Sequence, residues 1–365
     1  MKKIPLHGGD LIAASDRYGI AVEEWVDLST GLNPRPYPVG ELSEEVFSAL
    51  PYLRPEFLNT IESYYGRKDF LAIAGTQQII QLLPECLPDF TLLVPQFGYR
   101  EYADCWLRAG RRLDFYSSLC ELEAEQAIDE MLAIDGARHL LLINPNNPTG
   151  LKFSAQKVLS WAGRLNTGAY LVVDEAFMDV TPEQSVLAGE LPNNIIVLRS
   201  FGKFFGLAGI RLGVVFAHQS MLERFSRGCG LWHVNGPAQA IALKAFADLA
   251  WQKKNRQWLE QSNTLTQSVF APLFDLCALR TMTATLFFSV VLEKNNALRV
   301  YEFFASHGLL LRLHLLDNDT SLLRVGLIDS ANHLQLVRVR GLVEQCRKAC
   351  AGGWDDSDSA NELVV

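Results

Sequence analysis

Short apolar runs alternate with amphipathic segments over most of this 365-residue chain, and this alternation constrains the fold more than any other feature. Polar or turn-forming residues bound each run, which is the pattern of a strand buried on both faces. The predicted strands are Thr91–Val94, His139–Ile143, Tyr170–Val173, Ile195–Leu198 and Leu212–Phe216. The predicted helices between them include Gln77–Leu83, Arg100–Arg108, Ala155–Leu165 and Ala238–Leu249. We therefore predict an α/β fold with a mostly parallel central sheet, flanking helices, and functional loops at the carboxyl ends of its strands.

The pattern changes near residue 275 and indicates a smaller α+β domain. The predicted elements are strands over Leu286–Leu292, Leu309–Leu313 and Leu322–Val325, and helices over Ala297–Ser306 and Ala331–Ala349. At the other end, a short helix is expected over Leu11–Tyr18, with Asp10 as N-cap and Gly19 as its stop.

These patterns predict four segments. An N-terminal arm over 1–38 contributes to the small domain and to the active site, and a large domain covers 39–272. A small C-terminal domain covers 273–351, and an acidic tail over 352–365 is expected to be disordered.

Composition argues against several classes of function. The formal net charge of −8 disfavours nucleic acids and anionic membranes as partners, although local arginines can still bind a small anion. No apolar run reaches membrane-spanning length, and the N-terminus lacks the apolar core of a signal peptide. The seven cysteines are scattered and form no CxxC, so we expect reduced thiols of a cytoplasmic protein and no metal site.

A lysine in a glycine-rich segment carries the strongest chemical signal. Lys203 follows Ser200 by three residues and precedes Arg211 by eight. This arrangement suits a lysine that holds pyridoxal 5′-phosphate (PLP) as a Schiff base, while a hydroxyl and a guanidinium bind its phosphate. A surface position is the alternative for Arg211, but the apolar, glycine-rich surroundings disfavour it.

Two strand ends carry polar residues that suit the same cofactor. Asp174 follows a buried strand, where a carboxylate is costly unless it meets a cation such as a protonated pyridine nitrogen. A structural, loop-capping aspartate is the alternative. In the loop Asn144–Gly150, Asn147 is placed to donate its amide to the phenolic oxygen of PLP, or the loop is an ordinary Asn-Pro turn.

Two further segments extend this candidate site. Gly75, Thr76 and Gln77 open an amphipathic helix whose free N–H groups suit a phosphate, although glycine turns before helices are common. Tyr99 is expected to begin the next helix and to stack on the pyridine ring. Phe97 is the nearby alternative for this stacking role. Either ring could instead be an ordinary aromatic residue of the core.

Together these residues resemble the fold-type I PLP enzymes of the class I/II aminotransferase group, over nearly the whole chain. The resemblance implies a large PLP-binding domain, a PLP Schiff base on Lys203 and a homodimer with active sites at the subunit interface. It also implies that Tyr52 reaches the cofactor phosphate from the partner subunit.

Within the group, the chain is most similar to the threonine-phosphate decarboxylases of cobalamin biosynthesis. The similarity rests on the segments His7–Asp10, Trp25–Pro34, Ala74–Pro84 and Asp174–Phe177. It implies decarboxylation of L-threonine O-3-phosphate to (R)-1-aminopropan-2-yl phosphate and CO₂, with Lys203 and Asp174 as catalytic residues. Many related aminotransferases have tyrosine where this chain has Phe177. The alternatives are an aminotransferase, most plausibly acting on histidinol phosphate, and a non-catalytic PLP-binding module.

A phosphorylated amino acid requires an anion site besides the one for the cofactor. The resemblance offers His7 and Asn33 in the arm, and Arg324 as the carboxylate-binding arginine. Arg312 is a further candidate for contact with the substrate. The alternative places both arginines on the exposed face of a strand.

Overall fold

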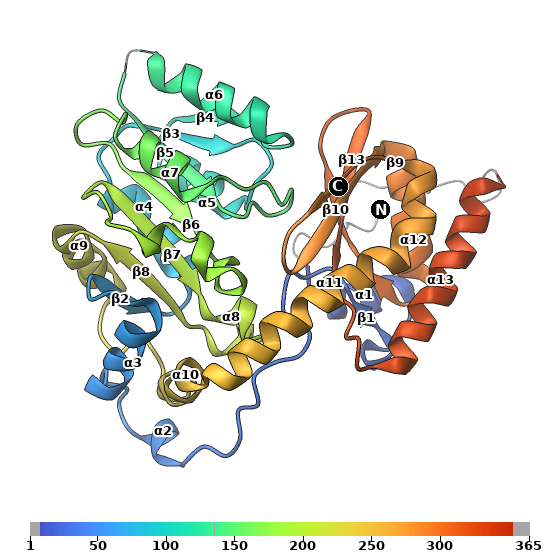
Figure 1. The fold of residues 1–365 in the computed structure, drawn as a ribbon, viewed down its shortest axis with the longest axis horizontal. Helices are drawn as coiled ribbons and strands as arrows, with labels where there is room; N and C mark the ends of the chain where they lie inside the picture. Colours follow the sequence, from blue (N-terminus) through green and yellow to red (C-terminus); the bar gives the residue numbers. More distant parts are fainter. Residues whose placement is uncertain (1–7, 135, 353–365) are drawn as a thin grey trace. The chain divides into compact units, whose positions relative to one another are not determined.

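The computed structural model describes residues 8–134 and 136–352 (Figure 1). His7 and nearly all of the acidic tail therefore lie outside the described residues. The chain divides into two compact units, one over Arg35–Arg256 and the other formed by residues up to Pro34 together with those from Gln257 onward. Each unit is described separately below.

A seven-stranded mixed sheet forms the centre of the Arg35–Arg256 unit (Figure 1). Its strands, in spatial order, are β2 (Phe70–Ile73), β8 (Gly213–Ala217), β7 (Ile195–Ser200), β6 (Leu171–Asp174), β5 (Arg138–Ile143), β3 (Thr91–Pro95) and β4 (Leu113–Tyr116). The five strands from β7 to β4 run parallel, whereas β8 is antiparallel to both of its neighbours. The predicted α/β class with a mostly parallel sheet is confirmed.

Helices on one face of this sheet bury a continuous apolar layer. They are α4 (Thr76–Cys86), α5 (Glu101–Arg108) and α9 (Gln219–Cys229). Leu83, Trp106 and Phe225 from these helices pack in one cluster with the sheet residues Val172 and Leu198. The strands β3, β5, β6 and β7 are buried along nearly their whole length, as expected for parallel strands. The remaining helices include α6 (Glu121–Ala133), α7 (Ala155–Ala162) and the short α8 (Phe201–Phe204).

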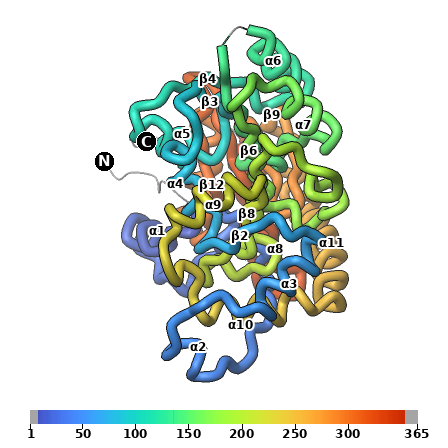
Figure 2. The backbone as a smooth tube through the Cα atoms, turned by 90° about the vertical axis from the view of Figure 1, so that its left-hand side faces the viewer, coloured from blue at the N-terminus to red at the C-terminus, as the bar shows by residue number. Residues whose placement is uncertain are grey.

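Three helices lie together at one end of the same unit (Figure 2). They are α2 (Glu45–Ser48), α3 (Pro55–Tyr65) and α10 (Gly236–Ala247). A Cβ on Gly236 would lie 2.1 Å from the carbonyl oxygen of Val46, so only glycine allows α10 to approach α2 this closely.

The second unit contains a four-stranded antiparallel sheet in the order β12 (Arg312–Leu315), β13 (Thr320–Gly326), β10 (Phe287–Glu293) and β9 (Ala278–Thr283). A separate parallel pair joins β1 (Val26–Asp27) to β11 (Leu309–Leu310). The helices are α1 (Leu11–Tyr18), α12 (Lys294–Ser306), α13 (His333–Ala351) and most of α11 (Leu249–Cys277). Phe270, Phe288 and Phe304 belong to its apolar core.

Helix α1 begins and ends as predicted. The Asp10 side chain accepts a hydrogen bond from the backbone N–H of Ala13, and Gly19 adopts a left-handed conformation with φ of 70°. In the part of the chain that the structure covers, no helix has both the length and the apolar character needed to cross a bilayer.

Most predicted elements agree with the structure to within one or two residues, and the following differences bear on the site or on strand pairing. Helix α5 begins at Glu101, so Tyr99 precedes the helix and does not begin it. Helix α7 ends at Ala162, where Gly163 follows, and does not continue to Leu165. The predicted strand Leu309–Leu313 is two strands, because the chain leaves its parallel pairing with β1 and joins β13 after Leu311.

Candidate active site

The carboxyl ends of β5, β6 and β7 place the predicted loops side by side. Ile143 is in register with Asp174, and Asp174 is in register with Leu198 on the next strand. The backbone N–H of Asn144 donates to the carbonyl of Asp174 at 2.8 Å. The loop after β5, the carboxylate that ends β6 and the lysine segment after β7 therefore share one edge of the sheet, as expected for parallel strands.

Asp174 is a buried carboxylate held by two donors. Its side chain accepts a hydrogen bond from the Tyr102 hydroxyl at 2.7 Å and another from the backbone N–H of Ala176 at 2.9 Å. Burial raises the pKa of Asp174, while the bonds from Tyr102 and Ala176 and the charge of Lys203 act to lower it. Such a carboxylate suits a cationic partner. Tyr102 was not singled out from the sequence, because it lies 72 residues away in the chain.

Lys203 lies in the short helix α8, directly after β7. Its Nζ atom lies 5.6 Å from the centre of the buried Phe177 ring. A Cβ on Gly202 would approach the Cα of Ala208 at 2.7 Å, so glycine is required where this segment folds back on itself. Lys203 therefore lies close to the segment that follows β6.

Gly75 and Arg211 fit against one another at the start of α4. Gly75 has φ of 81°, and a Cβ there would lie 2.5 Å from a guanidinium nitrogen of Arg211. Arg211 itself has φ of 56°, an uncommon conformation for a residue other than glycine. Gly213 pairs with both Ile73 and Ser200. This packing brings Ser200, Arg211 and the N–H groups that open α4 together, an arrangement that suits a phosphate.

Tyr99 is linked to α4 through a chain of hydrogen bonds. Its hydroxyl donates to Gln77 at 3.1 Å, and the Gln77 amide donates to Glu101 at 2.8 Å. Burial, followed by the charges of Glu101 and Asp174, raises the pKa of Tyr99 to about 12. Its ring meets that of Tyr102 edge-on, with centroids 6.4 Å apart. Tyr99 thus stands in the loop before α5, close to the other candidate residues.

The loop Asn144–Gly150 is held by its own side chains. Asn144 exchanges two hydrogen bonds with the backbone of Phe153, each 2.9 Å long. The Asn146 amide donates to Thr149 and to the carbonyl of Phe97, both at 2.7 Å. Asn147 is half-buried in this fixed loop. The bond from Asn146 also connects the loop to the segment that carries Tyr99.

A buried ionic network lies beside the site, and sequence reasoning missed it. Arg199 bonds to Glu175 at 2.8 Å and also to Asp179, and all three side chains are at most 2 % exposed. Burial lowers the pKa of Arg199, but the two carboxylates outweigh that effect and raise the pKa above its ordinary value. Glu175 adjoins Asp174 and Arg199 adjoins Ser200, so the network joins the ends of β6 and β7.

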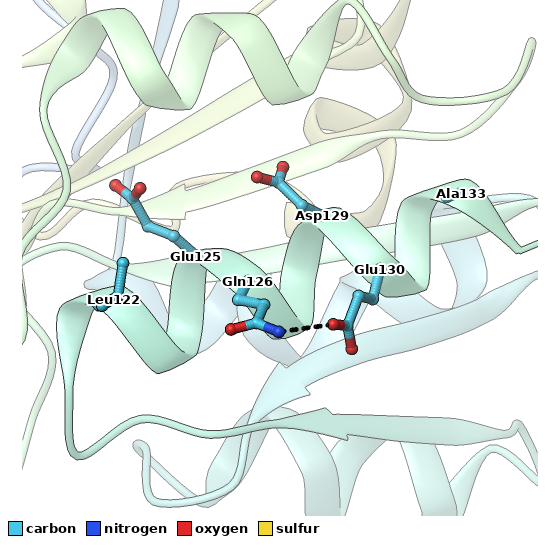
Figure 3. Close-up of a pocket in the computed structure, with 6 residues that line it drawn as sticks. All are labelled: Leu122, Glu125, Gln126, Asp129, Glu130 and Ala133. Carbon is cyan, nitrogen blue, oxygen red and sulfur yellow. Dashed lines mark hydrogen bonds between the residues drawn. The ribbon is translucent and has the colours of Figure 1, made fainter.

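Two hollows in the described structure contain none of the predicted site residues. One, of about 530 Å³, lies beside the ionic network and is lined by residues that include Tyr64, Tyr65 and Asp179. The other, of about 430 Å³, follows a single helix, α6 (Figure 3). There Asp129 accepts hydrogen bonds from Lys157 and Trp161, so its charge is already matched. We do not assign the active site to either hollow.

Tyr52 lies on the surface of the Arg35–Arg256 unit. Its side chain is 68 % exposed, and its ring meets Trp232 edge-on with centroids 5.9 Å apart. The Tyr52 side chain is therefore exposed on the surface of this chain.

Arg324 is buried in the second unit, so an exposed strand position is wrong for it. Its side chain is 7 % exposed, donates to the Ser29 carbonyl and lies over the Phe287 ring at 5.3 Å. Burial and the neighbouring Arg312 lower its pKa to about 9, opposed by Asp27. Arg312 is half-buried and stands opposite Arg324 in the β12–β13 pair.

The arm approaches Arg324 from within the same unit. Asn33 is 2 % exposed, and a Cβ on Gly8 would lie 2.4 Å from the carbonyl oxygen of Ser29. Nothing follows from this for His7, which is outside the described residues. Across residues 8–134 and 136–352, no group of three or more His, Cys, Asp or Glu side chains is arranged to hold a metal ion.

Residues 41–336 match the family described as aminotransferase class I and II. The chain belongs to this family. Threonine-phosphate decarboxylase from Pseudomonas aeruginosa is 39 % identical over 248 residues, which are 68 % of this chain and 72 % of the relative. The family resemblance seen in the sequence is confirmed.

Two solved structures share the aminotransferase fold of this chain. Histidinol-phosphate aminotransferase from Sinorhizobium meliloti, in complex with pyridoxal-5′-phosphate, has a TM-score of 0.72 at 18 % identity and covers 95 % of this chain and 99 % of its own. L-threonine-O-3-phosphate decarboxylase from Porphyromonas gingivalis has a TM-score of 0.70 at 18 % identity, with 87 % and 98 % covered. As a member of the class I and II aminotransferase family, this protein uses PLP as its cofactor.

The residues of the site fit that cofactor. The buried Asp174 carboxylate suits a cationic pyridine nitrogen, and the amine of Lys203 suits a Schiff base with the cofactor. Because Gly75 has no Cβ, the Arg211 guanidinium fits at the start of an 11-residue helix, a position that favours a phosphate.

Proposed function

We propose that this protein decarboxylates L-threonine O-3-phosphate to (R)-1-aminopropan-2-yl phosphate and CO₂ in cobalamin biosynthesis. The observation that carries the proposal is the 39 % identity to the Pseudomonas aeruginosa threonine-phosphate decarboxylase over about two thirds of the chain. The phenylalanine beside Lys203 agrees with it, since Phe177 supplies no hydroxyl there.

The residues of the Arg35–Arg256 unit would bind and tune the cofactor. When bound, PLP supplies the electron sink for breaking a bond to the substrate Cα. Asp174 keeps a proton on the pyridine nitrogen, and Tyr102 orients that carboxylate. Asn147 donates to the phenolic oxygen. Ser200, Arg211 and the N–H groups at Gly75–Gln77 hold the phosphate, while Tyr99 stacks on the ring.

Lys203 would both hold the cofactor and move a proton. Its amine would be the candidate donor of a proton to the substrate Cα. The residues that bind the substrate would select which bond to Cα breaks, and for decarboxylation this is the bond to the carboxylate. Arg324 binds the substrate carboxylate in this proposal, with Arg312, His7 and Asn33 as further substrate contacts.

We also propose that the protein acts as a homodimer, with Tyr52 reaching the partner's cofactor phosphate. The support is an exposed apolar surface on the Arg35–Arg256 unit, defined here as the dimer patch: Phe47, Leu50, Tyr52, Leu231, Trp232 and Leu243. Exposed apolar and aromatic side chains of this kind are typical of protein interfaces, and two of these rings, Tyr52 and Trp232, are in contact. The segment boundaries predicted from the sequence, and the cytoplasm as location, remain part of this proposal.

The deciding experiment compares two reactions of the purified, PLP-loaded protein. We expect CO₂ release from L-threonine O-3-phosphate and little 2-oxoglutarate-dependent transamination of histidinol phosphate. Robust transamination without CO₂ release would instead establish the aminotransferase alternative. Borohydride reduction and peptide mapping address a non-catalytic module, because a working site requires the pyridoxyl group on Lys203 and nowhere else.

A further inference from the structure

Three basic side chains share one face of the sheet in the second unit. Arg312 on β12 stands directly opposite Arg324 on β13, and His314 is two residues beyond Arg312 on the same strand. Opposite residues of an antiparallel pair project to the same face, and so do alternate residues of one strand. The intervening Leu313, Leu323 and Val325 belong to the apolar core on the other face. We name Arg312, His314 and Arg324 the basic triad.

His314 has an unsatisfied buried nitrogen. Its Nε2 atom is buried and has no hydrogen-bond partner in the described structure. Leaving a buried polar atom unpaired is unfavourable, so a native protein rarely keeps one without a purpose or a ligand. No interaction within the described chain accounts for this nitrogen.

The surroundings of His314 disfavour its protonated form. Burial, then the charges of Arg324 and Arg312, hold its pKa well below its usual value. The other titratable groups that act on the triad are Asp27 on β1, which acts on Arg324, and Tyr301 on α12, which acts on Arg312. The Asp27 carboxylate already accepts hydrogen bonds from the Ser29 N–H and hydroxyl.

A bound anion would reverse this balance. The two arginines repel a proton from His314, and a dianion placed against them would offset that repulsion and attract the proton. The protonated ring would then have a donor at Nε2 for the anion, and the unsatisfied atom would gain its partner. A monoanion would offset less of the repulsion, so the response depends on the charge of the ligand.

We propose that His314 is an additional substrate-binding residue, which takes up a proton from solvent when the phosphoryl dianion lies against Arg312 and donates a hydrogen bond to it from Nε2. This inference rests on the proposed function, because it assumes a phosphorylated substrate. It assigns to His314 the preference for a phosphoryl dianion over a singly charged group in the same position.

The first test measures proton uptake by the PLP-loaded wild-type protein. Sulfate is the probe, because it stays a dianion throughout pH 6–8 and so brings no titration of its own. Calorimetric titrations in buffers of different ionisation enthalpy report how many protons are taken up per sulfate bound. We expect uptake that approaches one proton near neutral pH, and affinity that rises as pH falls. Binding without proton uptake anywhere in this range would overturn the proposal.

The second test uses variants. His314→Gln should bind sulfate without proton uptake and should raise KM for L-threonine O-3-phosphate about tenfold or more, the effect of losing a charge-assisted hydrogen bond. Its kcat should change far less than its KM. His307→Gln is the matched control, because His307 is an exposed histidine of the same unit. Equal KM values for His314→Gln and the wild type would contradict the proposal.

The outcomes separate this inference from the proposed function. CO₂ release with no proton uptake on sulfate binding would overturn the role of His314 and leave the decarboxylase assignment standing. Failure to release CO₂ would overturn that assignment, whereas proton uptake that is lost in His314→Gln would still support a dianion site at the basic triad.

Discussion

At the scale of single residues, the candidate site combines groups whose roles depend on their neighbours. Asp174 is the clearest case, because burial and two hydrogen bonds act on its pKa in opposite directions. The bond from Tyr102 favours the charged carboxylate. Its removal should therefore raise the pKa of Asp174 further and reduce the fraction that is ionised.

Tyr102→Phe tests this assignment through the pH dependence of activity. We expect the acid limb of the kcat profile to move to higher pH, because protonation of Asp174 becomes easier when the hydroxyl is lost. Tyr116→Phe is the matched control, since Tyr116 is also buried and donates its hydroxyl to a backbone carbonyl, that of Leu141. Identical acid limbs in Tyr102→Phe and the wild type would argue against the role of Tyr102.

The residues predicted from the sequence are those with a local signal. Lys203, Asp174 and Asn147 each follow a short apolar run, and parallel strands bring such positions to one edge. Tyr102 and His314 carry no such signal. Tyr102 is one aromatic residue of an amphipathic helix, and its partner Asp174 lies 72 residues away. His314 is one polar residue in a strand, and its importance depends on how β12 pairs with β13.

At the scale of elements, buried polar groups hold neighbouring strands in position. The network of Arg199, Glu175 and Asp179 connects the ends of β6 and β7 next to the site. Removing one member of such a buried network leaves charges without compensation. The contribution of this network to the free energy of unfolding is therefore measured best by comparison with an ion pair nearer the surface.

Arg199→Met should lower the free energy of unfolding by about 3–5 kcal/mol, because two buried carboxylates lose their cation. Urea unfolding of the PLP-loaded protein would measure the loss. Arg138→Met is the control, since Arg138 pairs with the partly exposed Asp114 and should contribute at most about 1 kcal/mol. Equal losses in the two variants would remove the special role given to the network.

His139 on β5 makes stability depend on pH. Its Nε2 atom lies 3.0 Å from the Pro88 carbonyl, and its Nδ1 atom accepts from the Tyr170 N–H at 2.9 Å. Burial is the main cause that lowers its pKa from 6.5 to about 4. The unfolded chain therefore binds a proton more readily than the folded chain does. As pH falls from about 6.5 towards 4, protonation of His139 in the unfolded chain lowers the free energy of unfolding.

Urea unfolding at pH 7.5 and pH 5 should show the contribution of His139. We expect the wild type to lose about 2 kcal/mol more than His139→Gln over this interval, because only the histidine can take up the proton. His333→Gln, at the exposed start of α13, should behave like the wild type. A His139→Gln variant as sensitive to acid as the wild type would contradict this account.

Strand and helix types were largely predictable from hydrophobic periodicity, whereas pairing was not. The apolar run Leu309–Leu313 gives no sign that its first residues pair with β1 and its last with β13. Periodicity reports which residues are buried, but it does not identify the partner strand, and β1 lies near the opposite end of the chain.

At the scale of the whole molecule, the proposed homodimer makes a direct prediction. Phe47→Glu or Leu231→Glu places a charge in the dimer patch and should yield monomers, because a buried charge without a partner is strongly unfavourable. Light scattering after gel filtration would give the mass. Leu122→Glu, on exposed α6, is the control that should leave the mass unchanged. Dimers that persist in both patch variants would place the interface elsewhere.

The family and its cofactor were predictable because a few short motifs carry them, and the match over residues 41–336 confirms the family. The grouping of residues up to Pro34 with those from Gln257 onward has a different origin. It depends on backbone pairing between distant segments, such as the hydrogen bond from the Gly326 N–H to the Leu28 carbonyl at 2.7 Å. No local sequence pattern predicts such pairing.

The single residue between β11 and β12 has a consequence for sequence variation. Leu311 separates two strands that belong to different sheets, and the side chains after it alternate between the two faces of β12. One inserted residue there would turn Arg312 and His314 towards the apolar core, and two inserted residues would restore their direction. Related sequences should therefore tolerate insertions of two residues at this junction better than insertions of one.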